Sequence, residues 1–392
     1  MSEFSTKELS SLSGAPINFA QGIKSEGTEV GTDLFYMYSQ AAEPSSPADG
    51  TMWWTGSALK QWMNSKWRVI EATLPPVWYG DRALVLGGQS SSSLDVIDYY
   101  SLSTLGNAVD FGNMTLARQH QASCSSGTVV FTGGGITGSN YRNVIDKVVV
   151  ATAGNAVDSG DLIQSRIRLC SAANGIYGIW STGYSDHNNY RYDKSEYVVL
   201  ATGGNGVNHG YAYYIVPPGD SGAGYGSYLQ MMDSTMWGDK DKFIMAGGDK
   251  AGAPYLDIMA SARYDTPANS TYFGKLTQSR HEAASGGSAT KMVIGSGYLL
   301  GTTNAVYNVI DYVSMATAAS ATVFGALTTT IFNHGPNLTS DAVKCCWNGG
   351  RASVGYARIN TIQYVTIEVS SNTSDFGDLS VARSQTSGGS GT

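Results

Sequence analysis

Few side chains in this sequence combine the types and the spacing that catalysis or metal binding requires. None of the histidines lies at metal-ligand spacing from another along the chain, although His120 and His281 fall one step apart in equivalent positions of a repeat. The cysteines also lack the paired spacing of a zinc site. We therefore expect interior-filling histidines and buried free thiols, and we predict no metal site and no cofactor. The residues concerned are His120, His187, His209, His281, His334, Cys124, Cys170, Cys345 and Cys346.

A series of acidic or amide residues recurs about every 50 residues and resembles a set of catalytic carboxylates only superficially. A catalytic group is needed once, whereas a residue repeated in every unit answers a structural need such as hydrogen bonding to a neighbouring unit or turn. We therefore predict no catalytic residue, and a protein that is not an enzyme. The series is Asp98, Asp146, Glu196, Asp257, Asp311 and Gln363.

The repeated unit contains four predicted strands. Between Arg118 and Arg166 the chain has a strand of small residues, a glycine turn, an apolar strand ending in Gly-Gly, a loop, an alternating strand and a last short strand. A second marker, a glycine-bearing pair near the start of the last strand, also occurs six times. Both markers thus predict six units. The pairs are Phe111-Gly112, Ser159-Gly160, His209-Gly210, Phe273-Gly274, Phe324-Gly325 and Phe376-Gly377.

The two ends of the repeat region complement each other. The first unit begins at its second strand, in residues 82 to 87, and the last copy ends after a first strand, in residues 383 to 391. An open stack of repeats needs capping units, whereas a ring needs its first and last units to pair. We predict that these two segments pair in one composite blade and close the ring.

The order of elements and the glycine pairs resemble the kelch repeat, a four-stranded propeller blade. Gly87-Gly88, Gly133-Gly134 and Gly247-Gly248 match, and Gly349-Gly350 lies nearby, displaced toward the preceding turn. Thr182-Gly183 and Gly295-Ser296-Gly297 depart from the pattern, and the usual kelch Trp of the fourth strand is absent. The resemblance implies an all-β, six-bladed kelch-like β-propeller over residues 80 to 392.

Two stretches look like the kelch-like repeats of structural proteins in tailed phages, particularly marine ones. They are NVIDYVSMATAASATVFGAL and IQYVTIEVSSNTSDFGDLSVARSQTSGGSGT. This resemblance implies a virion protein of the tail, tail fibre, neck or capsid, made in the host cytoplasm. Its partners would be other virion proteins or further copies of itself.

The N-terminal region has a different pattern. Residues 1 to 45 show no sustained period and predict an extended arm, and residues 46 to 79 predict a small three-stranded meander. The meander resembles the aromatic-rich meander near the N-termini of phage tail-fibre proteins. Its tryptophans exceed what so small a sheet can cover, so they pack either on the propeller flank or on another chain as a docking interface. They are Trp53, Trp54, Trp62, Trp67 and Trp78.

The interval between Glu196 and Asp257 is 61 residues, longer than its neighbours, and it contains an insertion rich in tyrosine, glycine and proline. The insertion is either a longer blade edge or a surface loop that contacts a glycan or a protein partner, because tyrosine offers a large contact area with a polar tip. The tyrosines are Tyr211, Tyr213, Tyr214, Tyr225 and Tyr228.

Charge and hydropathy exclude several function classes. A net charge of -7 without basic runs argues against nucleic acid as a partner. The sequence begins without a signal-peptide pattern and contains no apolar stretch near the roughly 20 residues of a membrane span, so we expect no membrane insertion. Three functions remain: a virion structural protein, which we favour, a lectin-like binder of host-surface glycans, and a glycan-degrading enzyme. The enzyme would need paired carboxylates converging near the propeller axis.

Overall fold

The computed structural model describes residues 17–18, 24–25, 28–29, 36–39, 51–54, 59–63, 65–69 and 79–392, the last range without 186–189, 213–231, 250–255, 300–304 and 333–334. The chain divides into two compact units, Met1–Leu74 and Pro75–Thr392. Among the residues described, no helix is long and apolar enough to cross a membrane.

The first unit contains a five-stranded sheet with the order β1-β4-β5-β6-β7. Its last three strands are antiparallel neighbours in chain order, and β4 joins β5 in parallel. The segment expected to be an extended arm therefore contributes two strands to this sheet. The strands are β1 (Ile17–Asn18), β4 (Tyr36–Ser39), β5 (Met52–Trp54), β6 (Leu59–Met63) and β7 (Lys66–Val69), with β2 (Lys24–Ser25) and β3 (Thr28–Glu29) paired separately.

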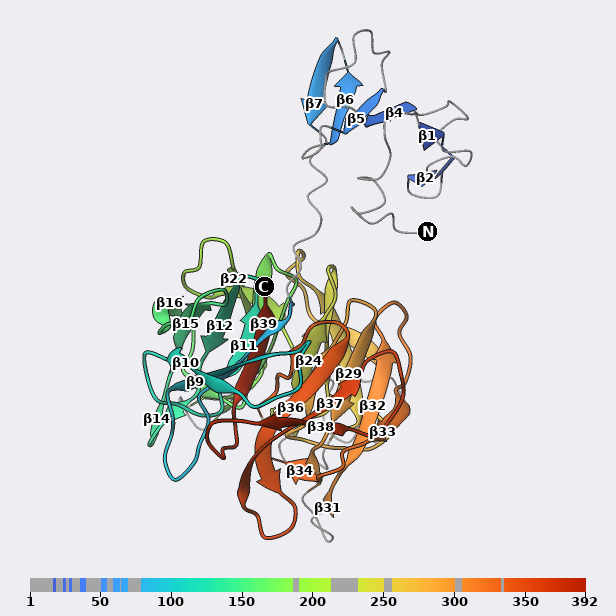
Figure 1. The fold of residues 1–392 in the computed structure, drawn as a ribbon. Helices are drawn as coiled ribbons and strands as arrows, with labels where there is room; N and C mark the ends of the chain where they lie inside the picture. The colour runs from blue at the N-terminus through green and yellow to red at the C-terminus, as the bar shows by residue number, and fades with distance from the viewer. Residues whose placement is uncertain are drawn as a thin grey trace. The chain divides into compact units, whose positions relative to one another are not determined.

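The second unit is a six-bladed β-propeller whose blades are antiparallel sheets around one axis (Figure 1). From the axis outward, blade 1 has β39 (Ser387–Gly391), β8 (Arg82–Leu86), β9 (Val96–Ser101) and β10 (Val109–Asn113). Blade 2 has β11 (Ala122–Ser125), β12 (Val129–Gly133), β15 (Val144–Val149) and β16 (Val157–Asp161). Blade 3 has β18 (Cys170–Ala173), β19 (Tyr177–Ser181), β22 (Lys194–Val199) and β23 (Val207–Tyr211).

The second half of the ring follows the same plan. Blade 4 has β24 (Thr235–Gly238), β25 (Lys242–Ala246), β26 (Ile258–Arg263) and β27 (Thr271–Lys275). Blade 5 has β28 (Ala284–Gly287), β29 (Lys291–Gly295), β32 (Val309–Ser314) and β33 (Thr322–Ala326). In blade 6 the long strand β36 (Lys344–Ala352) pairs with both β34 (Ile331–Phe332) and β35 (Thr339–Ser340), and β37 (Arg358–Thr366) and β38 (Ser374–Asp378) follow outward.

Short strands also form in the loops at one end of the blades. These are β13 (Ile136–Thr137) with β14 (Asn140–Tyr141), β17 (Arg166–Ile167) with β20 (Tyr184–Ser185) and β21 (Tyr190–Arg191), and β30 (Tyr298–Leu299) with β31 (Ala305–Val306).

The predicted ring closure is confirmed. The C-terminal strand β39 pairs with β8 in antiparallel register from Ser387 opposite Leu86 to Gly391 opposite Arg82. The first blade is therefore a composite of both ends of the propeller region, and the pairing satisfies the edge that β8 would otherwise expose.

The glycine-bearing pairs mark a β-bulge in every blade. The ladder between the third and fourth strands shifts register beside each glycine, as at Gly112 in blade 1 and Gly377 in blade 6. A Cβ added to Gly112 would lie 2.3 Å from the carbonyl oxygen of Gly154 in blade 2, and one added to Gly377 would lie 2.3 Å from that of Gly106 in blade 1. The glycine thus recurs because the next blade's backbone approaches too closely for a side chain.

The glycine pairs between the second and third strands are more regular than the sequence indicates. Gly349 and Gly350 take the same left-handed conformations as Gly87 and Gly88, so they are not displaced toward the preceding turn. Thr182-Gly183 and Ser296-Gly297 take them too, although Thr182 and Ser296 carry side chains. The turn between the second and third strands therefore keeps its backbone geometry even where its sequence is not Gly-Gly.

The acidic marker of the third strand was placed wrongly in blade 4. Asp98, Asp146, Glu196, Asp311 and Gln363 occupy equivalent positions on their strands, opposite the second strand of the same blade. In blade 4 that position, opposite Met245, belongs to Ala260, whereas Asp257 lies just before β26 with its side chain 4.0 Å from Lys275. Blade 4 has no acidic residue at this position, so Asp257, the nearest acid in the sequence, was identified wrongly as its equivalent.

Candidate functional site

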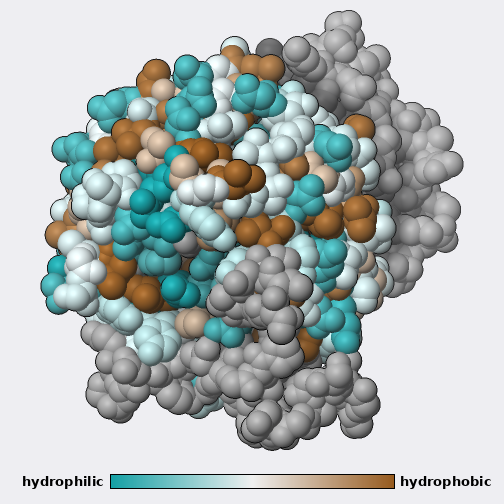
Figure 2. Space-filling model, turned by 90° about the horizontal axis from the view of Figure 1, so that it is seen from below, coloured by the Kyte–Doolittle hydropathy of each residue, from teal (hydrophilic) through white to brown (hydrophobic). Residues whose placement is uncertain are grey.

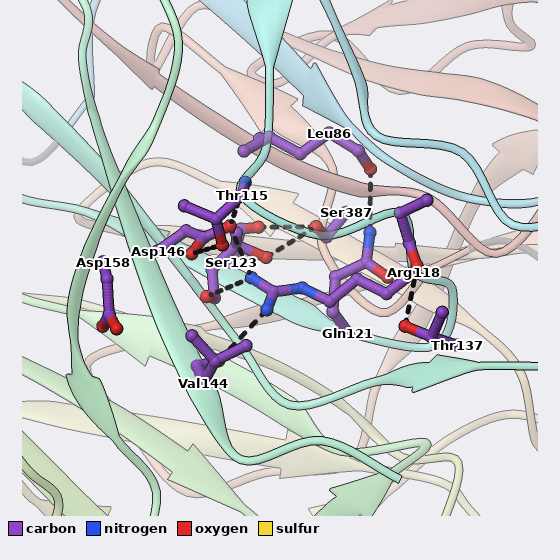
Figure 3. A network of polar contacts seen from close by, with 12 residues as sticks. Leu86, Thr115, Arg118, Gln121, Ser123, Thr137, Val144, Asp146, Asp158 and Ser387 are labelled. Carbon is purple, nitrogen blue, oxygen red and sulfur yellow. Dashed lines mark hydrogen bonds and ion pairs between the residues drawn. The ribbon is translucent and has the colours of Figure 1, made fainter. Parts of the chain in front are cut away.

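In four blades a buried arginine–acid pair joins the segment that precedes the innermost strand to the third strand. In blade 2 Arg118 Nη2 lies 3.1 Å from Asp146 Oδ2 and donates to Thr132 O at 3.0 Å, with the arginine and carboxylate side chains fully buried (Figure 3). Thr115 Oγ1, which precedes the blade, donates to the other carboxylate oxygen at 2.6 Å. The two buried charges therefore neutralise each other inside the blade. Thr115 also ties the carboxylate to the segment that precedes the blade. The other pairs are Arg166–Glu196, Arg280–Asp311 and Arg383–Asp98.

The same arginines also connect neighbouring blades through their backbone. The amide of Gly88 in blade 1 donates to Arg118 O at 3.0 Å, and Gly350 in blade 6 donates to Arg383 O at 2.8 Å. Because this arrangement repeats from blade to blade, it serves the architecture and not a reaction. In blades 4 and 6 the acid position holds Ala260 and Gln363, and the sequence has Met231 and Asn333 where the repeat has its arginine.

The central channel is crossed by a segment of blade 6. Asn337 Oδ1 accepts hydrogen bonds from Ser123 N at 3.1 Å and Ser171 Oγ at 3.0 Å, and Asn337 Nδ2 donates to Ser171 O at 2.7 Å. Pro336 O accepts from Thr235 Oγ1 at 2.5 Å and from Ser285 N at 3.2 Å. Blade 6 therefore bonds to blades 2, 3, 4 and 5 across the axis. On one side of this segment the channel has a cavity of about 30 Å³, enough for water and not for a sugar ring.

A ring of charged and polar residues surrounds the other end of the channel. The residue two positions before the innermost strand is left-handed in five blades, with φ between 54 and 59° at His120, Arg168, Asp233, Glu282 and Gln385. Backbone hydrogen bonds of 3.0 to 3.3 Å link each of these amides, apart from that of Gln385, to the carbonyl of the corresponding residue in the preceding blade. The backbone of this ring repeats, but its side chains differ in every blade. We call this set the mouth ring.

The mouth ring concentrates opposite charges in a mostly buried setting. Arg168 Nη1 lies 2.8 Å from Asp233 Oδ2, and His281 Nδ1 lies 3.8 Å from the same oxygen. Burial alone would raise the pKa of Asp233, but Arg168 and the nearby histidines hold it below its usual value. Burial, reinforced by the Asp233 charge, raises the pKa of Glu282 to about 7. Burial, with the Arg168 charge, lowers the pKa of His120 to about 3.

Asp233 and Glu282, from successive blades, bring two carboxylates close together in the mouth ring. The hollow they line, with Arg168, His120 and Pro336 beside them, has a volume of about 20 Å³. Figure 2 views the propeller from the side on which β14, β31 and β34 lie, and hydrophilic residues gather there in a hollow of the surface. A hollow of this size has room for a small ligand such as water or an ion.

The structure describes only some of the site residues predicted from the sequence. In the first unit Trp62 and Trp67 pack edge to face with ring centroids 5.3 Å apart. Trp53 and Trp54 lie on β5 with side chains outside the described residues, as is the whole of Trp78. In the insertion, Tyr211 is partly exposed at the end of β23 with Lys194 Nζ 5.7 Å from its ring centroid. The remaining tyrosines, Tyr213, Tyr214, Tyr225 and Tyr228, lie outside the described residues.

The mouth ring has a signal in the sequence. Each member lies two residues after the position of the repeated arginine, as Arg118 precedes His120 and Arg166 precedes Arg168. A position whose backbone role is fixed by the repeat while its side chain changes in every copy is free to carry a specific function.

Comparison with known proteins adds information on the fold alone. No family model matches this chain, and no curated protein sequence matches it. The solved structure of YjhT is similar, with a TM-score of 0.56 and 9% sequence identity, and the match covers 76% of this chain and 98% of that chain. At this identity the likeness supports the six-bladed propeller architecture and says nothing about the activity of this chain.

Proposed function

We propose that this protein is a structural component of a bacteriophage particle, in which the N-terminal unit docks on other virion proteins and the propeller is a rigid module. The proposal includes the finer assignment of the blades as kelch-like. Two observations support it. The blade sequences resemble those of phage structural proteins, and all six blades share the same turn geometry between the second and third strands.

The observation that best supports this proposal is that the propeller ring is closed at its circumference and filled along its axis. Its two ends pair within one sheet, and the segment at Pro336 and Asn337 fills the axis with hydrogen bonds to four other blades. A ring closed at its circumference and filled at its centre resists deformation, which suits a part that must hold its shape in an assembled particle.

Immunoelectron microscopy of purified particles tests the proposal. Antibodies against the full chain should label particles at one fixed place after gradient purification, and the protein should appear in the particle proteome at constant stoichiometry. A chain that is abundant in infected cells but absent from washed particles would contradict a virion role. Labelling must be lost when the antibody is preabsorbed with the purified protein.

A second candidate, a lectin-like binder of host-surface glycans, is favoured by one observation. The hollow at the mouth is lined by polar side chains: Arg168, whose side chain is 34% exposed, lies beside the buried Asp233 and the half-buried Glu282. A glycan array with the purified full chain separates the two candidates: specific binding weakened by Arg168→Gln would favour the receptor-binding role, and uniform absence of binding would favour the purely structural one.

A further inference from the structure

We propose that Asp233, His281 and Glu282 form a binding site for one divalent transition-metal ion at the mouth of the propeller channel. This site goes beyond the virion role, and sequence spacing gave no hint of it because its residues come from two blades. Asp233 precedes β24 of blade 4, and the other two residues precede β28 of blade 5.

The ligand atoms already lie close to coordination distance. One nitrogen or oxygen of each residue lies within 4.8 Å of the other two, and His281 Nδ1 is 3.8 Å from Asp233 Oδ2. Two ligand atoms bound to one tetrahedral zinc ion at about 2.0–2.2 Å lie about 3.5 Å apart. A small closing movement of the side chains is therefore enough to bind an ion.

Backbone hydrogen bonds fix the positions of the three residues. Asp233 and Glu282 are both left-handed, with φ of 54°, and Glu282 N donates to Asp233 O at 3.0 Å. His281 exchanges two backbone hydrogen bonds with Tyr298, of 3.2 and 2.9 Å. The ligands therefore need no backbone rearrangement, which lowers the cost of binding.

The ligand types select the class of metal. One imidazole and two carboxylates suit zinc, manganese or cobalt, whereas calcium and magnesium prefer oxygen ligands throughout. Asp233 and His281 each have side chains only 5% exposed, while Glu282 is half-buried and marks the open side. The adjoining hollow of about 20 Å³ has room for a water molecule as a further ligand.

Arg168 competes with the ion for Asp233. Its guanidinium lies 2.8 Å from Asp233 Oδ2, so binding must displace this contact or share the carboxylate. At 34% exposure the arginine side chain has a route to solvent. Removing its charge should therefore strengthen metal binding, whereas removing a ligand should weaken it.

Titration of the full chain with Co²⁺ after chelator treatment tests the proposal, because the visible absorption of Co²⁺ reports its coordination. Wild type should bind one equivalent and show a higher melting temperature with the metal. His281→Gln and Glu282→Gln should each lose more than about tenfold in affinity, the lower end of the loss seen when even an outer partner of a ligand is removed. Arg168→Gln should bind Co²⁺ more tightly than wild type, and Zn²⁺ should displace Co²⁺ while Ca²⁺ does not.

Two matched controls lie outside the cluster. Asp257→Asn removes a carboxylate beside Lys275, and His209→Gln removes a buried imidazole that faces Tyr264 O at 3.3 Å. Both should bind Co²⁺ like wild type once circular dichroism shows that they are folded. The proposal is overturned if wild type shows no saturable Co²⁺ spectrum, or if folded His281→Gln and Glu282→Gln proteins bind as well as wild type. An Arg168→Gln protein that binds more weakly would also overturn it.

Discussion

Arg383 Nη2 lies 3.1 Å from Asp98 Oδ2, and the side chains of both residues are completely buried. Arg383 precedes the C-terminal strand β39, and Asp98 lies on β9 of the first blade. Arg383 also donates to Val85 O at 3.0 Å. The two ends of the propeller are thus joined by an ion pair inside the same sheet that their backbones form.

Replacing Arg383 by Met should destabilise the propeller by about 3–5 kcal/mol, because removal of one partner leaves the Asp98 carboxylate buried without its countercharge. Urea unfolding followed by tryptophan fluorescence would measure this loss. The matched variant Arg358→Met removes an arginine that is not part of a buried arginine–acid pair, and it should cost much less.

The double variant Arg383→Met/Asp98→Ala should lose less stability than the sum of the two single variants. Blade 4 shows that the architecture tolerates the joint absence, since Ala260 occupies the acid position and Met231 the arginine position in the sequence. Additive losses in the double variant would mean that the two side chains act independently.

Deleting the last nine residues, 384 to 392, should sharply lower the melting temperature, because β8 then loses its inner partner β39 and exposes an unpaired edge beside the buried Leu84 and Leu86. Differential scanning calorimetry would detect the shift. Removal of Thr392 alone should cost only about 0.5–1.5 kcal/mol, the contribution of its one backbone hydrogen bond to Gly127 O. An unchanged melt in the longer deletion would mean that closure contributes nothing to stability.

The fold was predictable because the features that repeat are those the architecture requires. A bulge glycine such as Gly112 must recur, since the next blade's carbonyl leaves no space for a Cβ, and a β39-like first strand must be supplied by one end of the chain. The error at Asp257 came from a blade whose acid position holds Ala260. Locating each repeat by its acidic residue therefore fails in a blade whose sequence has neither the acid nor its arginine partner.

The charged mouth was not predictable from spacing. Asp233 and Glu282 lie in different repeats, about 50 residues apart in the sequence, and the packing of blade 4 against blade 5 brings them together. Histidine spacing along the chain is informative when ligands share one strand or turn, and here His281 meets a carboxylate from the neighbouring blade. In a propeller, the positions to compare are equivalent residues of successive blades.

Gly377→Ala should destabilise the protein by about 1–3 kcal/mol, as expected for a side chain forced into a packed interior. The added Cβ would lie 2.3 Å from Gly106 O, and Gly377 has φ of +149°. Gly154→Ala is the control, since nothing lies within 4 Å of its Cβ position. Equal melting temperatures for the two variants would show that the contact between blades 6 and 1 adjusts to the added methyl group without loss of stability.

The four cysteines should be unreactive in the native protein and reactive after unfolding. All are buried and free, and burial raises the pKa of the Cys346 thiol to about 12, so little of the nucleophilic thiolate exists at pH 8. Titration with Ellman's reagent should detect no fast-reacting thiol in buffer and four in denaturant. Cys124→Ala should reduce the number of thiols that react in denaturant to three, without producing a fast reaction in the native protein.

Because the unfolded Cys346 thiol loses its proton near pH 8.5 and the folded one near pH 12, the free energy of unfolding should fall as the pH rises through this interval. A native thiol that reacts within seconds at pH 8 would contradict this account of the core.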